Sequence, residues 1–152
     1  DIVTDRIVVG VDGSKSSVDA LRYAANIASA FGAPLEAVIT WTYPPVAGAI
    51  LIDEWSPEND AGGVLDAAIN RAFGDSPPGD LTRTVLAGPA ARSLIDLSKT
   101  SGMLVLGSRG HGGFAGLLLG SVSAACAEYA HCPVLIVHPR TAEQATPAGE
   151  TA

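Results

Sequence analysis

The chain has 152 residues, 47% of them hydrophobic and 16% charged, which suits a single globular domain that buries a core. Its formal net charge is −7 and its lysines and arginines form no cluster, which argues against a nucleic-acid partner, since such proteins carry a basic face. No apolar run approaches the roughly 18 residues of a membrane span, so no membrane partner is expected.

The two cysteines, Cys126 and Cys132, indicate free thiols and not a disulfide framework. They have no CxxC spacing, and the three histidines form no ligand motif with them, so no metal-binding residue is assigned. Free thiols suit a reducing compartment, and the chain shows no secretory signal pattern. We therefore expect a cytoplasmic location.

The first part of the chain predicts a strand, a helix and a second strand. Residues 6–11 are rich in β-branched side chains, which indicates a buried strand. Residues 17–31 keep apolar side chains at helical spacing, and Ser14 or Ser16 can cap this helix. Leu35–Trp41 is again apolar and predicts the second strand.

The middle of the chain is rich in turn residues. Prolines, glycines and acidic side chains over residues 43–63 predict a surface loop, followed by a helix over residues 64–73. A second loop leads into a strand over Leu81–Ala87. Gly88 and Pro89 then open the next helix, because proline suits a first helical turn.

The last part of the chain places a glycine-rich segment between a strand and a helix. Met103–Gly107 predicts a buried strand, residues 120–130 a helix and residues 133–138 a closing strand. The glycines between 107 and 120 leave backbone N–H groups free to turn toward an anion, and the helix N-terminus adds the positive end of its dipole. The domain is expected to end at residue 139, and residues 140–152 predict a disordered tail.

Strict alternation of strands and helices predicts an α/β fold, a doubly wound, Rossmann-like parallel sheet of five strands with helices on both faces. We expect the strand order 3-2-1-4-5, which makes strands one and four neighbours. Ligands of such sheets bind beyond the carboxyl ends of the strands. The turns at residues 10–14 and 107–121 both follow strand ends, so this order places them on one crevice.

The glycine-rich segment does not match three familiar motifs. The first turn lacks the dinucleotide fingerprint G-x-G-x-x-G, the loop has no lysine for a Walker motif, and no G-x-S-x-G elbow is present. The segment does contain Gly107, two residues, Gly110, nine residues, Gly120 and then Ser121. This spacing resembles the ATP-binding signature of the universal stress protein family, G-x2-G-x9-G-[ST].

The resemblance covers nearly the whole chain. The first strand and turn (VVGVDGS), the Gly-Pro-Ala turn at 88–90 and the closing segment CPVLIV are all similar to segments of that family. The resemblance implies an adenine-nucleotide alpha-hydrolase-like fold. It also implies a nucleotide site made of Asp12, Thr40, Gly107, Arg109, Gly110, Gly120, Ser121, Val122 and Ser123.

The resemblance implies a role for the residues that surround the nucleoside. Asp12 would lie near ribose and phosphates, although an aspartate there can also simply shape its turn. Gly107 and Gly110 would bring their backbone close to ribose and phosphate. The backbone around Thr40 would face adenine. Arg109 would either contact a phosphate or face solvent.

The resemblance also implies how the phosphates are held. Gly120 and Ser121 would hold the outer phosphates, with Ser123 as a second hydroxyl. Glycines permit close approach, hydroxyls donate to oxyanions, and the helix dipole points at them. The alternative is that Ser121 and Ser123 only cap the last helix.

The resemblance implies a homodimer that pairs through the last strand, Val134–Val137, and binds ATP, AMP or another adenine nucleotide with Mg²⁺. The expected function is that of an ATP-binding universal stress protein, a nucleotide-dependent stress-response or signalling module. Two alternatives stay open: a slow ATPase or phosphate-transferring enzyme on the same fold, and a dimeric structural protein with a vestigial nucleotide site. The loop has no lysine and no carboxylate pair, so no catalytic residue is assigned and any ATPase activity is expected to be weak.

Overall fold

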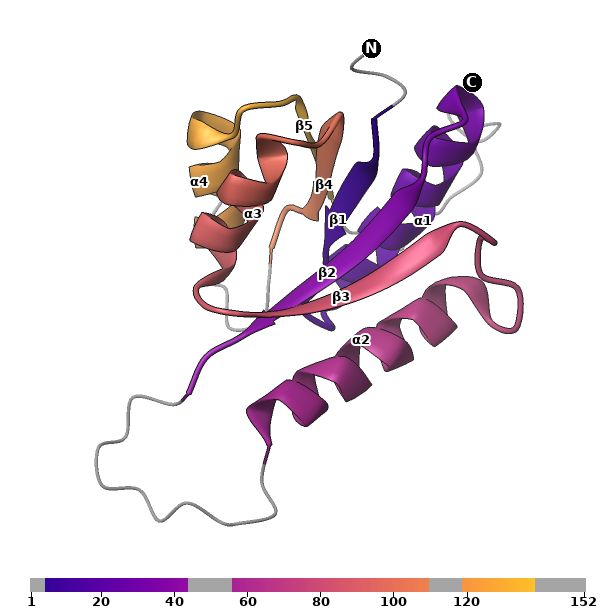
Figure 1. The fold of residues 1–152 in the computed structure, drawn as a ribbon, viewed down its shortest axis with the longest axis horizontal. Helices are drawn as coiled ribbons and strands as arrows, with labels where there is room; N and C mark the ends of the chain where they lie inside the picture. Colours follow the sequence, from indigo (N-terminus) through magenta and orange to yellow (C-terminus); the bar gives the residue numbers. More distant parts are fainter. Residues whose placement is uncertain (1–4, 44–55, 110–118, 139–152) are drawn as a thin grey trace, which may run out of the picture.

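A computed structural model describes residues 5–43, 56–109 and 119–138 (Figure 1). The predicted domain end near residue 139, the tail after it and Gly110 lie outside these residues. Strands and helices alternate along the described chain: β1 (Ile7–Gly10), α1 (Lys15–Phe31), β2 (Leu35–Trp41), α2 (Pro57–Phe73), β3 (Leu81–Ala87), α3 (Ala90–Ser98), β4 (Met103–Gly107), α4 (Ser121–Tyr129) and β5 (Val134–Val137).

The strands form one five-stranded parallel sheet in the order β3-β2-β1-β4-β5, which confirms the predicted doubly wound fold and its strand order. Strand β1 lies in the middle, with Ile7 opposite Leu35 of β2 and Met103 of β4. Helices α1 and α2 cover one face of the sheet, and α3 and α4 cover the other (Figure 1). Because the strands are parallel, all of them end at the same edge.

Strand β1 is buried on both faces. Ile7, Val8 and Val9 are at most 1% exposed. Ile7 and Val9 belong to the core under α1 and α2, and Val8 belongs to the core under α3 and α4. Each such side chain stabilises the fold by about 1.5–3 kcal/mol on burial, which explains why the strand is apolar throughout and does not alternate.

Ser14 begins α1. Its side-chain oxygen accepts a hydrogen bond from the Ser17 N–H at 3.2 Å, so Ser14 and not Ser16 is the cap. Gly32 ends the helix in the left-handed region, with φ of 66°. Ser16 is instead buried, and its hydroxyl donates to the Val137 carbonyl at 3.2 Å, which ties the start of α1 to the end of β5.

Helix α2 begins at Pro57, well before the predicted start at residue 64. Ser56 caps it by accepting a hydrogen bond from the Asn59 N–H at 3.1 Å. Pro57 stands in the first turn, and Glu58 and Asp60 meet the positive end of the helix dipole. The prediction of a loop through residue 63 is therefore wrong, because residues that disfavour a helix interior favour its first turn.

Candidate functional site

The turns that follow β1 and β4 lie side by side at the carboxyl edge of the sheet. Their strands pair directly, and the Ser14 hydroxyl in the first turn donates to the Arg109 carbonyl in the second at 3.4 Å. The crevice expected from the strand order would lie at this contact. Residues 12–14 are on one side of it, and residues 108–109 and 119–120 are on the other.

Asp12 is exposed and stands in the first of these two turns. Its carboxylate accepts a hydrogen bond from the Ser14 N–H at 2.9 Å, and its own N–H donates to the Ser17 hydroxyl at 3.4 Å. Asp12 thus shapes its turn, which was the alternative reading of this residue. The same bonds hold its side chain at the surface of the crevice.

Strand β2 extends past the end of β1. Within the described chain, the last hydrogen bond between these strands joins the Val11 N–H to the Val38 carbonyl at 2.8 Å. Peptide groups alternate in direction along a strand, and Trp41 directs its carbonyl to the Gly88 N–H on the β3 side. The N–H and carbonyl of Thr40 consequently face the β1 side of β2, beyond the point where β1 ends. They provide one donor and one acceptor beside the first turn.

Only glycine fits at position 107, because α1 packs directly against it. A Cβ on Gly107 would lie 2.7 Å from the Ser16 carbonyl carbon and 2.8 Å from Ser16 Cβ, which is too close for any side chain. Its own carbonyl accepts a hydrogen bond from the Ser123 hydroxyl in α4. On the Cβ side of Gly107, the close approach is therefore that of helix α1.

The N-terminus of α4 begins at the crevice without a side-chain cap. Gly120 is the N-cap residue, and its N–H donates to the Ser108 carbonyl at 2.7 Å. Neither Ser121 nor Ser123 occupies the cap position, so the alternative that they serve only as caps does not hold. The first turn carries no acidic side chain, which leaves its N–H groups and the positive end of the dipole open to an anion.

Ser123 and Ser108 are both buried, but their hydroxyls differ. The Ser123 hydroxyl donates to the Gly107 carbonyl, whereas the Ser108 hydroxyl has no hydrogen-bond partner within residues 5–43, 56–109 and 119–138. Sequence reasoning selected Ser123 and assigned no role to Ser108. The available signal was the position of Ser108 inside the motif, between Gly107 and Gly110.

The other predicted site residues differ in exposure. Arg109 and Ser121 are exposed, and Val122 is half-buried against the core under α3 and α4. Gly110 lies outside the described residues. The structure therefore brings together the predicted residues of three segments: the turn at Asp12, the end of β4 and the start of α4.

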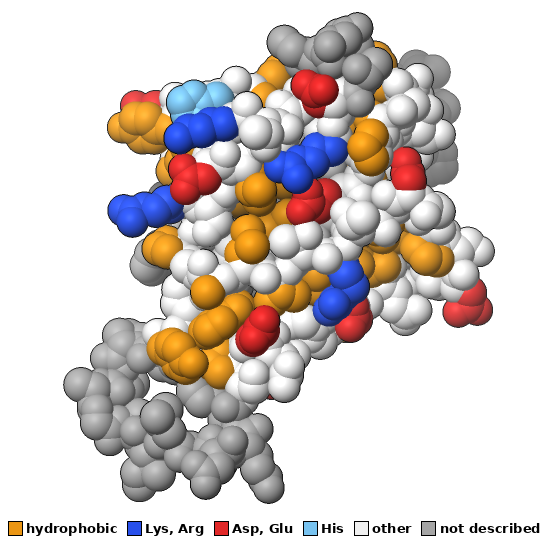
Figure 2. Space-filling view, in the orientation of Figure 1, with side chains coloured by type: hydrophobic (Ala, Val, Ile, Leu, Met, Phe, Trp, Pro, Cys, Tyr) orange, Lys and Arg blue, Asp and Glu red, His pale blue; other side chains and the backbone are white. Residues whose placement is uncertain are grey.

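The basic side chains form no patch on the face that Figure 2 shows. On the face shown in Figure 2 they lie singly, beside acidic side chains. Ion pairs join Arg6 to Glu36 and Arg83 to Asp66, each with an N–O distance of 2.7 Å.

Across the described ranges, no group of three or more His, Cys, Asp or Glu side chains could hold a metal ion. Among the helices that the structure describes, none has both the length and the apolar character to cross a membrane.

Both cysteines are free thiols, as the sequence predicted. Burial raises the pKa of Cys126 to about 11, with a smaller contribution from Cys132. Burial also raises the pKa of Cys132. Neutral thiols are poor nucleophiles, so the two cysteines serve the packing between α4 and the sheet.

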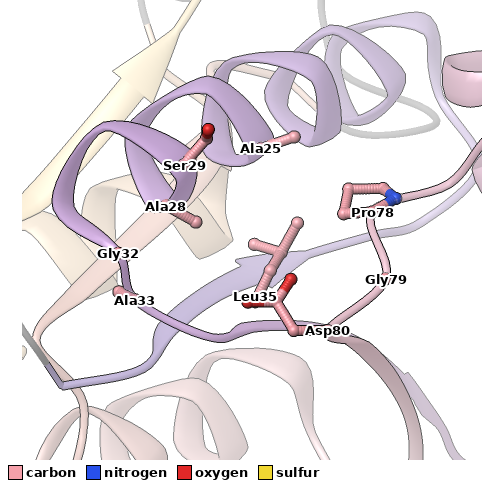
Figure 3. A pocket seen from close by; sticks show the side chains of 9 residues that line it. All are labelled: Ala25, Ala28, Ser29, Gly32, Ala33, Leu35, Pro78, Gly79 and Asp80. Carbon is pink, nitrogen blue, oxygen red and sulfur yellow. The ribbon is translucent and has the colours of Figure 1, made fainter.

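A cavity of about 350 Å³ lies at the opposite edge of the sheet, where the strands begin (Figure 3). It is enclosed by the last turns of α1, the start of β2 and the loop before β3. Its lining is mostly small or apolar, with Ser29 and Asp80 as the polar side chains: Ala25, Ala28, Ser29, Gly32, Ala33, Leu35, Pro78, Gly79 and Asp80. Ligands of doubly wound sheets bind at the other edge, so this cavity is separate from the crevice.

Comparison with known proteins identifies the family. The model of the "Universal stress protein family" matches residues 4–138. The chain belongs to the universal stress protein family. Universal stress protein Rv2623 of Mycobacterium tuberculosis is 32% identical over 141 residues, an alignment that covers 87% of this chain and 47% of that protein. The chain thus spans about half the length of the curated relatives it matches.

Solved structures of universal stress proteins share the fold. A universal stress protein in complex with cAMP is 31% identical, with a TM-score of 0.58 and coverage of 90% of this chain and 98% of that one. UspA from Lactobacillus plantarum is 21% identical, with a TM-score of 0.68 and coverage of 88% and 97%. The second likeness shows the fold alone, and the first also shows a related protein with an adenine nucleotide bound.

Replacing Gly107 by alanine tests the contact between β4 and α1. The added methyl group meets the Ser16 backbone, so α1 must shift, and we expect the free energy of unfolding in urea to fall by about 1–3 kcal/mol. Gly63→Ala is the control, because a Cβ there has nothing within 4 Å and lies in a helix. A Gly107→Ala protein as stable as this control would contradict the packing.

The raised pKa of the Cys126 thiol leads us to expect a loss of stability at alkaline pH. It stays neutral in the folded protein up to a pKa of about 11, whereas the unfolded chain ionises near 9.0. Its contribution is fully present below pH 9 and is lost as the pH rises through 11, because only the unfolded state gains the thiolate. We expect the melting temperature to fall more steeply over this interval in the wild type than in Cys126→Ala, and parallel profiles would contradict the assignment.

Proposed function

We propose that this universal stress protein binds an adenine nucleotide in the crevice, with ATP as the first candidate, and acts as a nucleotide-dependent stress-response module. One observation carries the proposal: the uncapped N-terminus of α4 is joined to the end of β4 by the hydrogen bond from Gly120 to Ser108. The relative in complex with cAMP supports adenine nucleotides as the ligand class. AMP fits the same description.

The phosphates bind at the N-terminus of α4. Ser121 and Val122 offer backbone N–H groups of the first turn, and Gly120 leaves the approach to them free of a side chain. The exposed Arg109 adds a positive charge beside them. Gly110, the next residue of the motif, belongs to the same proposed site.

The adenosine part lies toward β2. The N–H and carbonyl of Thr40 face the crevice, and one donor with one acceptor matches the N1 and N6 edge of adenine. Asp12, exposed at the rim, accepts from ribose hydroxyls. Gly107 contributes through its position at the end of β4, and Ser123 holds the Gly107 carbonyl.

Mg²⁺ accompanies the phosphates in this proposal. Magnesium binds phosphate oxygens, water and one or two carboxylates. In the described turns at this edge of the sheet, Asp12 is the one acidic side chain. The residues therefore fit a magnesium ion held mainly by the nucleotide, with Asp12 as its protein ligand.

The site favours binding over hydrolysis. Phosphoryl transfer depends on several charged groups in position, and the glycine-rich loop contains no lysine. Asp12 has no second carboxylate beside it in the described turns. We expect weak ATPase activity at most. The net charge of −7 gives no reason to propose a nucleic-acid partner.

We also propose that β5 pairs with β5 of a second copy of the domain. Strand β5 is an edge strand, and an unpaired edge is a template for another strand. Leu104 of β4 and Ser108, the residue after β4, donate to the carbonyls of Pro133 and Val137. Because peptide groups alternate, residue 136 directs its N–H to the open edge. The curated relatives are about twice as long as this chain, which leaves room for a second such domain within them.

Nucleotide analysis and calorimetry test the proposed binding. The purified protein is denatured and any released nucleotide is identified by mass spectrometry, and the emptied protein is titrated with ATP, AMP, cAMP and adenosine. We expect a Kd for ATP at or below about 100 μM, about −5.5 kcal/mol, and weaker binding of adenosine. An empty protein that binds none of the four contradicts the proposal. Repeated turnover of ATP that Asp12→Ala abolishes would instead support the ATPase.

A backbone change in β5 tests the dimer. Ile136→Pro removes the N–H that faces the open edge, and proline is tolerated on edge strands. Ile136→Ala loses the same side chain but keeps the N–H, so it is the matched control. We expect Ile136→Ala to stay dimeric in analytical ultracentrifugation and Ile136→Pro to dissociate at least about tenfold more readily, about 1.4 kcal/mol. Equal dimer affinity of the two variants would place the interface elsewhere.

A further inference from the structure

Ser108 lies between the end of β4 and the crevice. Its N–H donates to the Val137 carbonyl at 2.8 Å, and its carbonyl accepts from the Gly120 N–H at 2.7 Å. The residue is 0% exposed. Its backbone is thus held between the end of β5 and the N-cap residue of α4.

Among the residues that the structure describes, the Ser108 hydroxyl has no hydrogen-bond partner, in contrast to the Ser108 backbone. A buried hydroxyl without a partner has lost its water and gained nothing in return, so native proteins rarely keep one without a use. An apolar side chain of similar size, such as alanine, would avoid this loss. The hydroxyl therefore needs a partner that the described part of the protein does not supply.

The Ser108 side chain lies on the face of β4 that α4 covers. The Cβ direction of Gly107 points at Ser16 of α1, on the opposite face. Side chains alternate along a strand, and Leu106 accordingly packs in the core under α3 and α4. Ser108 shares that face with Leu106, and its carbonyl is hydrogen-bonded to Gly120, the N-cap residue of α4.

Ser123 provides the comparison. Its hydroxyl already donates to the Gly107 carbonyl, so a phosphate could recruit it only at the cost of that bond. The Ser108 hydroxyl gives up no hydrogen bond when it turns. A serine side chain exchanges among three staggered rotamers, which lets the hydroxyl reorient without a backbone movement.

We propose that Ser108, and not Ser123, supplies the side-chain hydroxyl that donates to a phosphate oxygen at the N-terminus of α4. The inference rests on the proposed nucleotide binding and adds a residue to it. Hydrogen bonds to ionised oxygens are about twice as strong as neutral ones, so the phosphate is a better partner than a neutral ligand group. Ser108 thereby favours phosphorylated ligands over the nucleoside.

Ser108→Ala tests the inference through the stability of the free protein, which should not fall, and the affinity for nucleotides, which should fall. Loss of the unpaired hydroxyl should raise the melting temperature of the nucleotide-free protein or leave it unchanged. The same variant should bind ATP and AMP about tenfold more weakly in calorimetry, while its affinity for adenosine stays within twofold of the wild type. Circular dichroism checks that the variant keeps its fold.

Ser98→Ala is the matched control. Ser98 is also buried, but its hydroxyl donates to the Ile95 carbonyl and accepts from the His131 N–H at 2.8 Å. It lies at the end of α3, outside the proposed site. We expect this variant to melt at a lower temperature than the wild type and to bind ATP equally well.

Four results would overturn the inference. A lower melting temperature of free Ser108→Ala would show that the hydroxyl already has a partner, such as an internal water. Equal losses for ATP and adenosine would indicate a distorted site. Unchanged ATP affinity of Ser108→Ala beside clear binding by the wild type would refute the role of Ser108 and leave the proposed function standing. A wild type that binds neither ATP nor adenosine would refute both.

Discussion

Strand β4 lies directly beside β1, although β2, β3 and three helices separate them in the chain. The close packing of α1 holds this arrangement. Gly107 leaves room for Ser16, and the Ser16 hydroxyl reaches the Val137 carbonyl in β5. Because Gly107 has no side chain, α1 can pack directly on the end of β4 and bond to the end of β5. This packing fixes the ends of β1 and β4 relative to each other, and the two turns of the proposed site begin at these ends.

Within the crevice, the hydrogen bonds of the fold decide which groups remain for a ligand. The Thr40 peptide faces the crevice because β1 turns away, and α4 has no side-chain cap because Gly120 has no side chain to supply one. The Ser123 hydroxyl is used by Gly107, whereas the Ser108 hydroxyl is not used. The position of a serine in a motif therefore does not tell whether its hydroxyl is available to a ligand. Its hydrogen bonds in the folded protein do.

Secondary structure was predictable where the apolar pattern is strong, as in β1 and α1. The start of α2 was not, because Pro57 and Gly62 each disfavour a helix when judged locally. In the structure Pro57 stands in the first turn, and Gly62 lies beneath Arg83 of β3, which donates to its carbonyl at 3.2 Å. A Cβ on Gly62 would lie 3.1 Å from that guanidinium. A contact with a later strand has no signature in the neighbouring residues.

The amino-acid sequence by itself determined the alternation of buried strands and helices, the family, and the spacing of glycines and serines after β4. These properties depend on periodicity and turn chemistry among neighbouring residues. Only the tertiary structure decided that α1 occupies the space at Gly107, that the Ser123 hydroxyl is hydrogen-bonded and that the Ser108 hydroxyl finds no partner among the described residues. The physical reason is that hydrogen-bond partners and close contacts come from distant segments, as Ser16 and Val137 do, and depend on how the helices pack on the sheet.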